Sequence, residues 1–218
     1  MLIIGAKGFA GELLEIVCQN NPDEQVAFYD DINADLPEAI FDKYEIIKNL
    51  KDAEKYLVSG DGKFALGTGN PLTRYKLAAK FRSIGGELIS VISPFARIGR
   101  FANFVGTGSN ILTGAIIESN NRIGSANLIH VNVLISHDVI TGDFCEISPS
   151  VNLLGGVVVG NFCSIGTGAT VLPKLKLGDN VIVGAGAVVT KNIPDNSMVC
   201  GVPAKVIKKL EPIDFQNE

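Results

Sequence analysis

The sequence contains no tryptophan, and aromatic residues make up only 7% of its 218 residues. Charged residues are also scarce, at 19%, and the formal net charge of −4 argues against a surface that binds nucleic acid or an anionic membrane. The apolar run Met1–Ile4 is too short for a signal peptide, and no apolar stretch reaches the length of a membrane span. These absences predict a soluble, cytoplasmic protein without a nucleic-acid or membrane partner.

An aliphatic residue instead recurs at every sixth position from Ile111 to Val189, interrupted only by Thr141. A period of six fits neither an amphipathic helix nor a plain alternating strand. It is typical of a parallel β-helix, in which each group of six residues forms one short wall and stacked coils bury a continuous aliphatic column. The positions of the series are Ile111, Ile117, Ile123, Ile129, Ile135, Thr141, Ile147, Leu153, Val159, Ile165, Val171, Leu177, Val183 and Val189.

The repeat can be extended backwards through Phe104 and Ile98 to Ile92 if one extra residue is allowed near residues 106–110. This gives about five to six coils of roughly eighteen residues. The last part of the chain leaves the repeat, and Lys205–Leu210 is expected to form a terminal helix or a strap. Glycine often follows the aliphatic residue, where we expect corners that need unusual backbone angles. These glycines are Gly99, Gly124, Gly142, Gly160, Gly166, Gly178 and Gly184.

The four cysteines form no CxxC pair and show no metal-ligand spacing. Cys145 and Cys163 are separated by three repeats of six, so they should stack on the same wall of adjacent coils. We expect buried free thiols rather than a disulfide or a catalytic thiol. The two histidines, His130 and His137, offer too few ligands for zinc unless a trimer shares them.

Residues 1–90 lack the repeat and alternate short apolar runs with helical patterns, as in a small parallel α/β sheet. Helical stretches follow the first strand, cover Asp52–Leu57 and begin near Pro71. We therefore predict two domains, 1–90 and 91–218, the second with a terminal strap. The expected strands of the first domain are Met1–Ile4, Val26–Tyr29, Tyr44–Ile47, Phe64–Leu66 and Leu88–Ile92.

The loop Gly5–Gly11 follows the first predicted strand and opens a helix, as anion-binding loops do. Its spacing is GxxGxxG rather than GxGxxG, and the first domain is too short for the full dinucleotide-binding fold. Asp30 and Asp31 follow the loop by about twenty residues, where an acidic group can bond a ribose or a sugar amine. A nucleotide sugar fits this pattern better than NAD. Ordinary turn glycines and an acidic pair at a strand end are the alternative.

His137 is directly followed by Asp138 and falls where the repeat predicts an outward or corner placement. Acetyl transfer from a thioester to an amine or hydroxyl needs a base that works near neutral pH, which imidazole does. A neighbouring carboxylate stabilises the charged imidazole and makes it a stronger base. A solvated corner histidine is the alternative. For His130 two interpretations are open, a residue that shapes an acceptor pocket and an inert surface residue.

Six motifs mark the chain, namely Gly5-Ala6-Lys7-Gly8, Tyr29-Asp30-Asp31, Gly69-Asn70 with Arg74, Ser136-His137-Asp138, Leu154-Gly155-Gly156 and Gly201-Val202-Pro203-Ala204-Lys205. With them the chain resembles the hexapeptide-repeat acyltransferases, in particular bacterial sugar acetyltransferases: nucleotide-sugar N-acetyltransferases and the sialic-acid O-acetyltransferase group. The resemblance implies a small Rossmann-like α/β domain followed by a left-handed parallel β-helix. It also implies a homotrimer with active sites between neighbouring prisms, and acetyl-CoA as co-substrate without a metal.

The resemblance implies that His137 is the general base, that Asp138 enhances its basicity, and that the Gly155 N–H stabilises the oxyanion. It assigns the backbone of Thr167 and Ala185 to the groove that holds the pantetheine arm of CoA. Lysines near the end of the chain concentrate positive charge that can hold CoA phosphates, and an ordinary solvated face is the alternative. These lysines are Lys174, Lys176, Lys191, Lys205, Lys208 and Lys209.

Three residues depart from the family pattern. Relatives often have a histidine that contacts acetyl-CoA at the position of Glu146, a histidine at Phe9 and an asparagine at His130. Glu146 therefore remains a predicted cofactor contact of altered chemistry, or an exposed residue of a β-helix wall. The acceptor nucleotide is expected on Lys7, Gly8, Phe9, Asp30 and Asp31.

The predicted function is acetyl-CoA-dependent N-acetylation of the amino group of a nucleotide-linked sugar, a UDP-4-amino-4,6-dideoxy sugar in particular, by direct attack with a histidine base. One alternative is a sugar O-acetyltransferase, because a hydroxyl acceptor needs the same residues. The other is a non-catalytic protein that binds a nucleotide sugar or CoA, which the carboxylate at Glu146 would favour.

Overall fold

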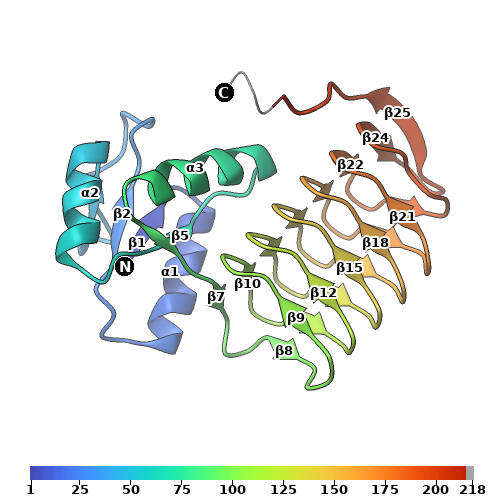
Figure 1. Cartoon of the computed structure of the whole chain (residues 1–218), viewed down its shortest axis with the longest axis horizontal. Helices are drawn as coiled ribbons and strands as arrows, with labels where there is room; N and C mark the ends of the chain where they lie inside the picture. The colour runs from blue at the N-terminus through green and yellow to red at the C-terminus, as the bar shows by residue number, and fades with distance from the viewer. Residues whose placement is uncertain (215–218) are drawn as a thin grey trace.

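A computed structural model describes residues 1–214, which form a small α/β domain beside a three-walled prism (Figure 1). The sheet of the first domain has the order β3-β4-β2-β1-β5-β6, and all its pairs are parallel except β3 with β4. Its strands are β1 Leu2–Ile4, β2 Ala27–Tyr29, β3 Ala39–Ile40, β4 Tyr44–Ile47, β5 Lys63–Leu66 and β6 Glu87–Leu88. Its helices are α1 Phe9–Asn20, α2 Leu50–Ser59 and α3 Pro71–Ser83.

The central strands are apolar throughout because helices cover both faces of the sheet. Ile3 and Phe28 pack with the α1 side, whereas Leu2 and Tyr29 pack with α2 and α3. The helices α2 and α3 begin at asparagine caps, each accepting a backbone N–H, but α1 begins at Gly8 without a side-chain cap. In the first turn of α1 the N–H groups of Ala10 and Gly11 donate to Lys7 O and Gly8 O, so among residues 1–214 the N–H groups of Gly8 and Phe9 are left without an acceptor.

The prism consists of parallel strands, each paired with the strand one coil further along, so that residues eighteen apart stand in register. The first wall comprises β7 Val91–Ile92, β10 Asn110–Ile111, β13 Leu128–Ile129, β16 Glu146–Ile147, β19 Ser164–Ile165, β22 Val181–Val183, β24 Ser197–Cys200 and the antiparallel β25 Lys205–Lys209. The second wall comprises β8 Arg97–Ile98, β11 Ile116–Ile117, β14 Leu134–Ile135, β17 Asn152–Leu153, β20 Thr170–Val171 and β23 Val188–Val189. The third wall comprises β9 Phe104–Val105, β12 Arg122–Ile123, β15 Ile140–Thr141, β18 Val158–Val159 and β21 Lys176–Leu177.

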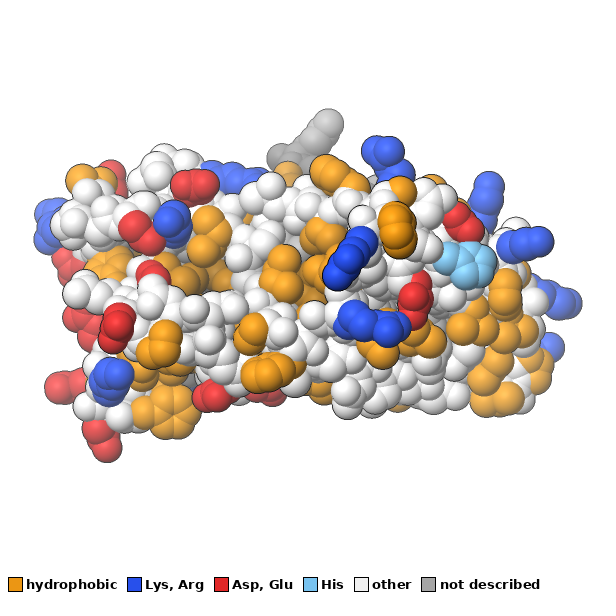
Figure 2. Space-filling model, turned by 90° about the horizontal axis from the view of Figure 1, so that it is seen from below, with side chains coloured by type: hydrophobic (Ala, Val, Ile, Leu, Met, Phe, Trp, Pro, Cys, Tyr) orange, Lys and Arg blue, Asp and Glu red, His pale blue; other side chains and the backbone are white. Residues whose placement is uncertain are grey.

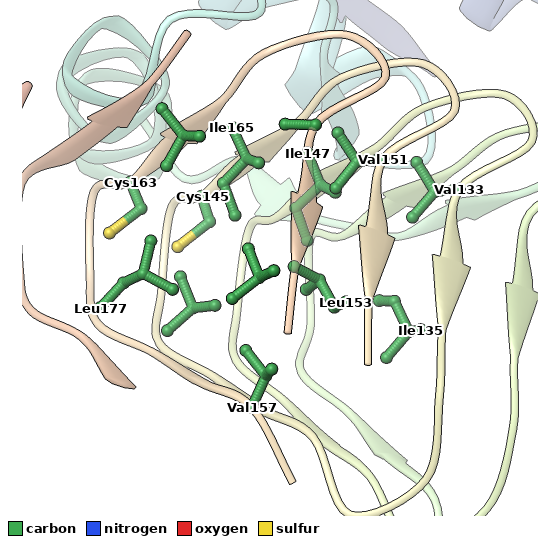
Figure 3. Packing of buried hydrophobic residues seen from close by; sticks show 14 of the residues in the cluster. Val133, Ile135, Cys145, Ile147, Val151, Leu153, Val157, Cys163, Ile165 and Leu177 are labelled. Carbon is green, nitrogen blue, oxygen red and sulfur yellow. The ribbon is translucent and has the colours of Figure 1, made fainter. Parts of the chain in front are cut away.

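The aliphatic series fills the interior of the prism, together with most of the residues four positions after its members (Figure 3). After Ile117 and Ile123 these residues are the buried polar Asn121 and Asn127. Cys145 and Cys163 lie in this core as buried free thiols on adjacent coils, as predicted. Thr141, the polar exception in the series, is 4% exposed, and its hydroxyl accepts a hydrogen bond from Asn127 Nδ2 at 3.1 Å. The buried hydroxyl is therefore satisfied rather than destabilising.

The predicted register of the first coil was wrong. Phe104 points outward with 59% exposure, and Val105 pairs with Ile123 and packs against the core. Val105 follows Ile98 by seven positions instead of six, so the extra residue lies between these two strands and not near residues 106–110. An exposed phenylalanine cannot be told from a core one by spacing alone.

The predicted reason for the corner glycines was also wrong. Gly142 does not have a positive φ; instead, a Cβ there would lie 2.5 Å from Asn161 Oδ1 and 2.7 Å from Gly160 C. Glycine is needed because adjacent coils approach too closely for a side chain. Positive φ falls two residues later in the repeat and is tolerated by Phe144 and Asp138, among others.

Two expected elements differ in detail. The run Leu88–Ile92 is divided between β6 of the first domain and β7 of the prism. The segment Lys205–Leu210 forms the strand β25, which pairs antiparallel with β24, so the strap and not the helix is observed.

Arg74 fastens the first domain to the prism. Its side chain is fully buried, and burial lowers the pKa of its guanidinium to about 9. The guanidinium donates hydrogen bonds to carbonyls of both domains, with no carboxylate in ion-pair contact among the described residues. The acceptors are the carbonyl oxygens of Leu66, Thr68, Gly108, Ala126 and Asn127. Within residues 1–214, no helix is long and apolar enough to cross a membrane.

Candidate functional site

His137 and Asp138 lie at the corner between the second and third walls, which we call the open corner (residues 136–139 and 154–157). His137 Nδ1 and Asp138 Oδ2 are 2.6 Å apart, and Asn120 Nδ2 donates to Asp138 Oδ1 at 2.5 Å. These hydrogen bonds, from His137 first and Asn120 second, hold the pKa of Asp138 below its usual range. An ionised carboxylate only accepts hydrogen bonds, so the proton sits on Nδ1 and Nε2 is left free as a base.

Gly155 lies directly against that free nitrogen. A methyl group at Gly155 would lie 2.7 Å from both Nε2 and Cε1 of His137. Among residues 1–214 the Gly155 N–H has no hydrogen-bond partner, whereas the next N–H, of Gly156, donates to His137 O. Pro149 and Pro173, which have no backbone N–H, occupy the equivalent position of their repeats. The backbone hydrogen bonds between coils therefore do not need an N–H at this position. The open corner thus combines a base with an unused backbone donor.

Glu146 and His130 lie on the opposite side of the prism, where the first wall meets the first domain. His130 Nε2 is 3.9 Å from Glu146 Oε1, and the His130 ring lies 5.5 Å from the ring of Phe9 on α1. A Cβ at Gly69, in the loop after β5, would lie 2.9 Å from Glu146 Oε1. Burial, and then the charge of Arg74, lower the pKa of His130 to about 4. The imidazole is therefore neutral at pH 7.

The predicted acceptor residues of the first domain line the carboxyl ends of β1 and β2. Gly8 has φ 43° at the start of α1, with open space where a side chain would project. Lys7 is exposed and pairs with Asp35 at 3.2 Å. The order of the strands reverses between β1 and β5, and ligands of such sheets bind at the strand ends beside this point.

The two aspartates after β2 have structural partners. Asp30 is nearly buried, and its carboxylate accepts hydrogen bonds from the backbone of Ile32 and Asn33. Asp31 accepts from Tyr29 and from Lys80, each at 2.7 Å. Burial raises the pKa of Asp31, but these hydrogen bonds outweigh it and bring the value below its usual range.

Thr167 and Ala185 stack on successive coils at the corner between the first and second walls, where Gly186 N donates to Thr167 O at 2.8 Å. On the face shown in Figure 2, most acidic side chains lie over the first domain, whereas basic ones are more frequent toward the far end of the prism. The lysines predicted to hold CoA phosphates all belong to residues 174–209, in the last part of the chain.

The structure brings together His137, Asp138 and Gly155, but it separates them from the other candidates. The open corner is the one corner of a three-walled prism that does not border the first wall, and the first domain packs on the first wall. Sequence reasoning missed Asn120 and Lys80. Asn120 could have been found, because it stands one coil of eighteen residues before Asp138. Lys80 carries no such signal.

Within residues 1–214, no group of three or more His, Cys, Asp or Glu side chains is arranged to hold a metal ion.

Two family models match parts of the chain. The PglD N-terminal domain matches residues 1–81, and the bacterial transferase hexapeptide (six repeats) matches residues 156–191. No curated protein matches the chain at a significant level. These two matches assign the two halves of the molecule separately.

Several solved structures are similar over nearly the whole chain. PerB from Caulobacter crescentus, in complex with CoA and GDP-perosamine, is 30% identical with a TM-score of 0.86, covering 95% of this chain and 96% of that chain. WeeI from Acinetobacter baumannii AYE is 27% identical with a TM-score of 0.85, covering 94% and 98%. The acetyltransferase domain of PglB from Neisseria gonorrhoeae FA1090, in complex with acetyl coenzyme A, is 25% identical with a TM-score of 0.84, also covering 94% and 98%.

These similarities confirm the predicted fold class, a small Rossmann-like α/β domain followed by a left-handed parallel β-helix. The similarity to PerB, at 30% identity, extends over both domains and is not limited to the repeat. The chain belongs to the family of hexapeptide-repeat, acetyl-CoA-dependent sugar acetyltransferases.

Proposed function

We propose that the protein transfers the acetyl group of acetyl-CoA to the amino group of a nucleotide-linked sugar, with a UDP-4-amino-4,6-dideoxy sugar as the acceptor predicted from the sequence. The observation that carries this proposal is the open corner, where the free Nε2 of His137 faces a glycine with an unused N–H. PerB, a perosamine N-acetyltransferase that binds CoA and GDP-perosamine, supports an amino sugar as acceptor. Cytoplasmic location stays a prediction.

The reaction proceeds by direct attack in a complex of both substrates. The acceptor nitrogen bonds to the thioester carbon while His137 Nε2 takes a proton from that nitrogen. Asp138 stabilises the imidazolium that forms, and the Gly155 N–H donates to the oxyanion of the tetrahedral intermediate. When the C–S bond breaks, the imidazolium returns its proton to the CoA thiolate. The products are an amide and CoA.

The acceptor nucleotide binds at the carboxyl edge of the first domain, which we define as residues 1–90. The start of α1 offers the backbone N–H groups of Gly8 and Phe9 to its phosphates, and Lys7 borders this position. Phe9 projects toward the prism, where the sugar must reach. Asp30 and Asp31 bind the ribose or the sugar directly, or shape the loop through the hydrogen bonds described above.

The pantetheine arm of acetyl-CoA lies along residues 91–218 in a groove between neighbouring prisms, with the backbone of Thr167 and Ala185 of one copy on one side and Gly155 of the other copy at its reactive end. The lysines at the far end of the prism bind its phosphates. The prediction that Glu146 also contacts the cofactor remains untested, and its neighbours favour the acceptor side instead.

A second copy of the chain completes each site. His137 lies on the side of the prism away from the first domain of its own chain. A nucleotide sugar bound to that first domain therefore reaches only the His137 of another copy. A homotrimer with sites between neighbouring prisms satisfies this requirement for all copies equally.

The proposed activity is tested by mixing the protein with acetyl-CoA and a panel of UDP- and GDP-linked amino sugars while thiol release is followed with a chromogenic reagent. We expect release that depends on a 4-amino sugar. His137→Ala should lower kcat by about 100- to 10,000-fold and leave acetyl-CoA binding intact. Normal turnover in this variant would remove His137 from the mechanism. Release with hydroxyl sugars alone would make the enzyme an O-acetyltransferase.

The shared site is tested by complementation. His137→Ala and a first-domain variant, Gly8→Trp, should each be nearly inactive in a homogeneous oligomer. Co-assembled oligomers should regain activity, because some sites combine an intact His137 with an intact first domain of the neighbour. Sites built within one chain would give no recovery, and light scattering of the same samples reports whether three copies associate.

A further inference from the structure

Glu146 and His130 form a polar pair that the transfer mechanism does not use. Both side chains are largely buried, with 25% of Glu146 and 14% of His130 exposed. Phe9 covers the imidazole from α1, and Gly69 leaves room for the carboxylate beneath the loop after β5. The pair therefore lies where both acceptor-binding loops of the first domain meet the prism.

No positively charged side chain among the described residues forms an ion pair with the Glu146 carboxylate at pH 7. Burial raises the pKa of Glu146, and the positive charge of Arg74 acts in the opposite direction. Arg74 itself is fixed by carbonyl groups, so it does not neutralise Glu146 through a direct ion pair. His130 is neutral at pH 7 because burial lowers its pKa to about 4. An incoming cation would meet a carboxylate without a charged partner in contact.

The surface that follows the pair along the chain is hollowed. A groove of about 570 Å³ lies between α1 and the corner of the first and second walls, with Gly11, Leu112 and Val131 in its lining. Val131 directly follows His130, and Gly11 lies two residues after Phe9. His130, Phe9 and Glu146 do not themselves line this groove, so a ligand reaches the carboxylate through the 25% of the Glu146 side chain that is exposed.

We propose that Glu146, which lies beside His130, is a specificity-determining residue that binds the amino group of the acceptor sugar and selects it over a hydroxyl. This inference rests on the proposed function and names the chemistry that its acceptor must have. A primary ammonium bound here loses one proton to solvent before the attack and the second to His137 of the neighbouring copy during it.

The alternative is a contact of Glu146 with the thioester of acetyl-CoA. The thioester oxygen gains negative charge in the transition state, and a carboxylate beside it would raise the barrier through like-charge repulsion. The same carboxylate would bind an ammonium more tightly through a charge-assisted hydrogen bond, and it would also fix the orientation of the ammonium. Electrostatics therefore favours the acceptor side.

The deciding experiment is steady-state kinetics of Glu146→Gln, which keeps the shape and removes the charge. We expect the KM for the active amino sugar to rise about 10- to 100-fold, while the KM for acetyl-CoA changes less than about twofold. The preference for the amino sugar over its hydroxyl analogue should fall by a similar factor. Glu118→Gln, on the exposed carboxylate that pairs with Arg97, is the matched control and should leave all constants unchanged.

A raised KM for acetyl-CoA in Glu146→Gln, or unchanged constants for both substrates, would overturn the proposal. Thermal melting must show that the variant folds like the wild type. Glu146→Asp, which keeps the charge, should retain more of the amino preference than Glu146→Gln, and equal losses would point to shape rather than charge.

A binding measurement separates failure of this inference from failure of the proposed activity. The chain has two histidines, so protein labelled with 13C at histidine Cε1 gives two imidazole signals, which His137→Asn assigns. GDP-perosamine and UDP-linked amino sugars should shift the His130 signal even without turnover, whereas UDP, GDP and CoA alone should not. A His130 shift caused by CoA alone, or by none of these ligands, would contradict an acceptor site at Glu146.

Discussion

Two corners of the same prism treat their backbone N–H groups in opposite ways. At the corner between the third and first walls, which we call the Asx corner, a side-chain oxygen from each coil accepts the corner N–H of the coil before it. These bonds are Ser125 N to Asp143 at 2.7 Å, Asp143 N to Asn161 at 2.9 Å, Asn161 N to Asp179 at 2.6 Å and Asp179 N to Asp195 at 2.9 Å. At the open corner, the corresponding N–H groups of His137 and Gly155 have no partner among residues 1–214.

The difference shows how a regular repeat produces a site. Each corner N–H is a donor that the ladder between coils does not need, as the prolines at equivalent positions demonstrate. The Asx corner converts these donors into cohesion between coils. The open corner leaves one of them beside a histidine, where it is available to a reacting oxygen. The same backbone therefore contributes to stability at one corner and, in our proposal, to chemistry at another.

After His137→Ala, the largest expected effect is that of Gly155→Ala. The new methyl group would lie 2.7 Å from His137 Nε2 and so displace the base from the backbone donor. We expect kcat to fall about 100- to 1000-fold. The melting temperature should change little, because the open corner has no bonds of the Asx type to lose. Activity close to that of the wild type would show that the contact between Gly155 and His137 plays no part in catalysis.

At the remaining corner, between the first and second walls, the largely buried His130 should make the free energy of unfolding depend on pH. His130 has a pKa of about 4 in the folded protein, against an ordinary value of 6.5, so the unfolded chain binds its proton first as the pH falls. Stability should therefore decline between pH 6.5 and about 4, by up to roughly 3 kcal/mol at the acid end. Glu146, whose pKa is raised by burial, opposes this trend as it becomes protonated.

This pH dependence is measured by denaturant unfolding at a series of pH values. His130→Asn should flatten the decline between pH 6.5 and 4, and Glu146→Gln should steepen it by removing the opposing group. A wild-type profile that coincides with that of His130→Asn would mean that the imidazole is protonated as easily in the folded protein as in the unfolded chain.

The smaller effect of a glycine at the Asx corner sharpens the contrast with Gly155. In Gly142→Ala, the methyl group would lie 2.5 Å from Asn161 Oδ1 and push the coils apart. We expect a loss of about 1–3 kcal/mol in the free energy of unfolding, with kcat per folded protein unchanged. Denaturant titration and thiol release on the same preparation check both parts. A selective loss of kcat would mean that the two corners are mechanically coupled.

The repeat was readable from the sequence because a buried aliphatic residue at a fixed spacing reports both the coil and its register. The failure at Phe104 occurred where the repeat is interrupted, since spacing carries no information across an insertion. His137 and Asp138 are neighbours in sequence, so their pairing could be predicted as well. The contact between Phe9 and His130, and that between Gly69 and Glu146, could not, because these residues are distant in sequence and meet only through the packing of two domains.

The smallest expected effect is the loss of one bond of the Asx corner. Asn161→Ala leaves the N–H of Asp143 without its acceptor and removes the bond from Asn161 Nδ2 to Asp179 at 3.1 Å. The site is exposed, so water replaces part of both bonds, and we expect a cost of about 1 kcal/mol in the free energy of unfolding. Asn161→Asp keeps the oxygen that accepts from Asp143 N but replaces the donor to Asp179 with a second carboxylate oxygen, so like-charge repulsion should leave it no more stable than Asn161→Ala. If both variants are as stable as the wild type, the side-chain hydrogen bonds of the Asx corner do not stabilise the stack of coils. Only the open corner would then distinguish this prism from a uniform stack of coils.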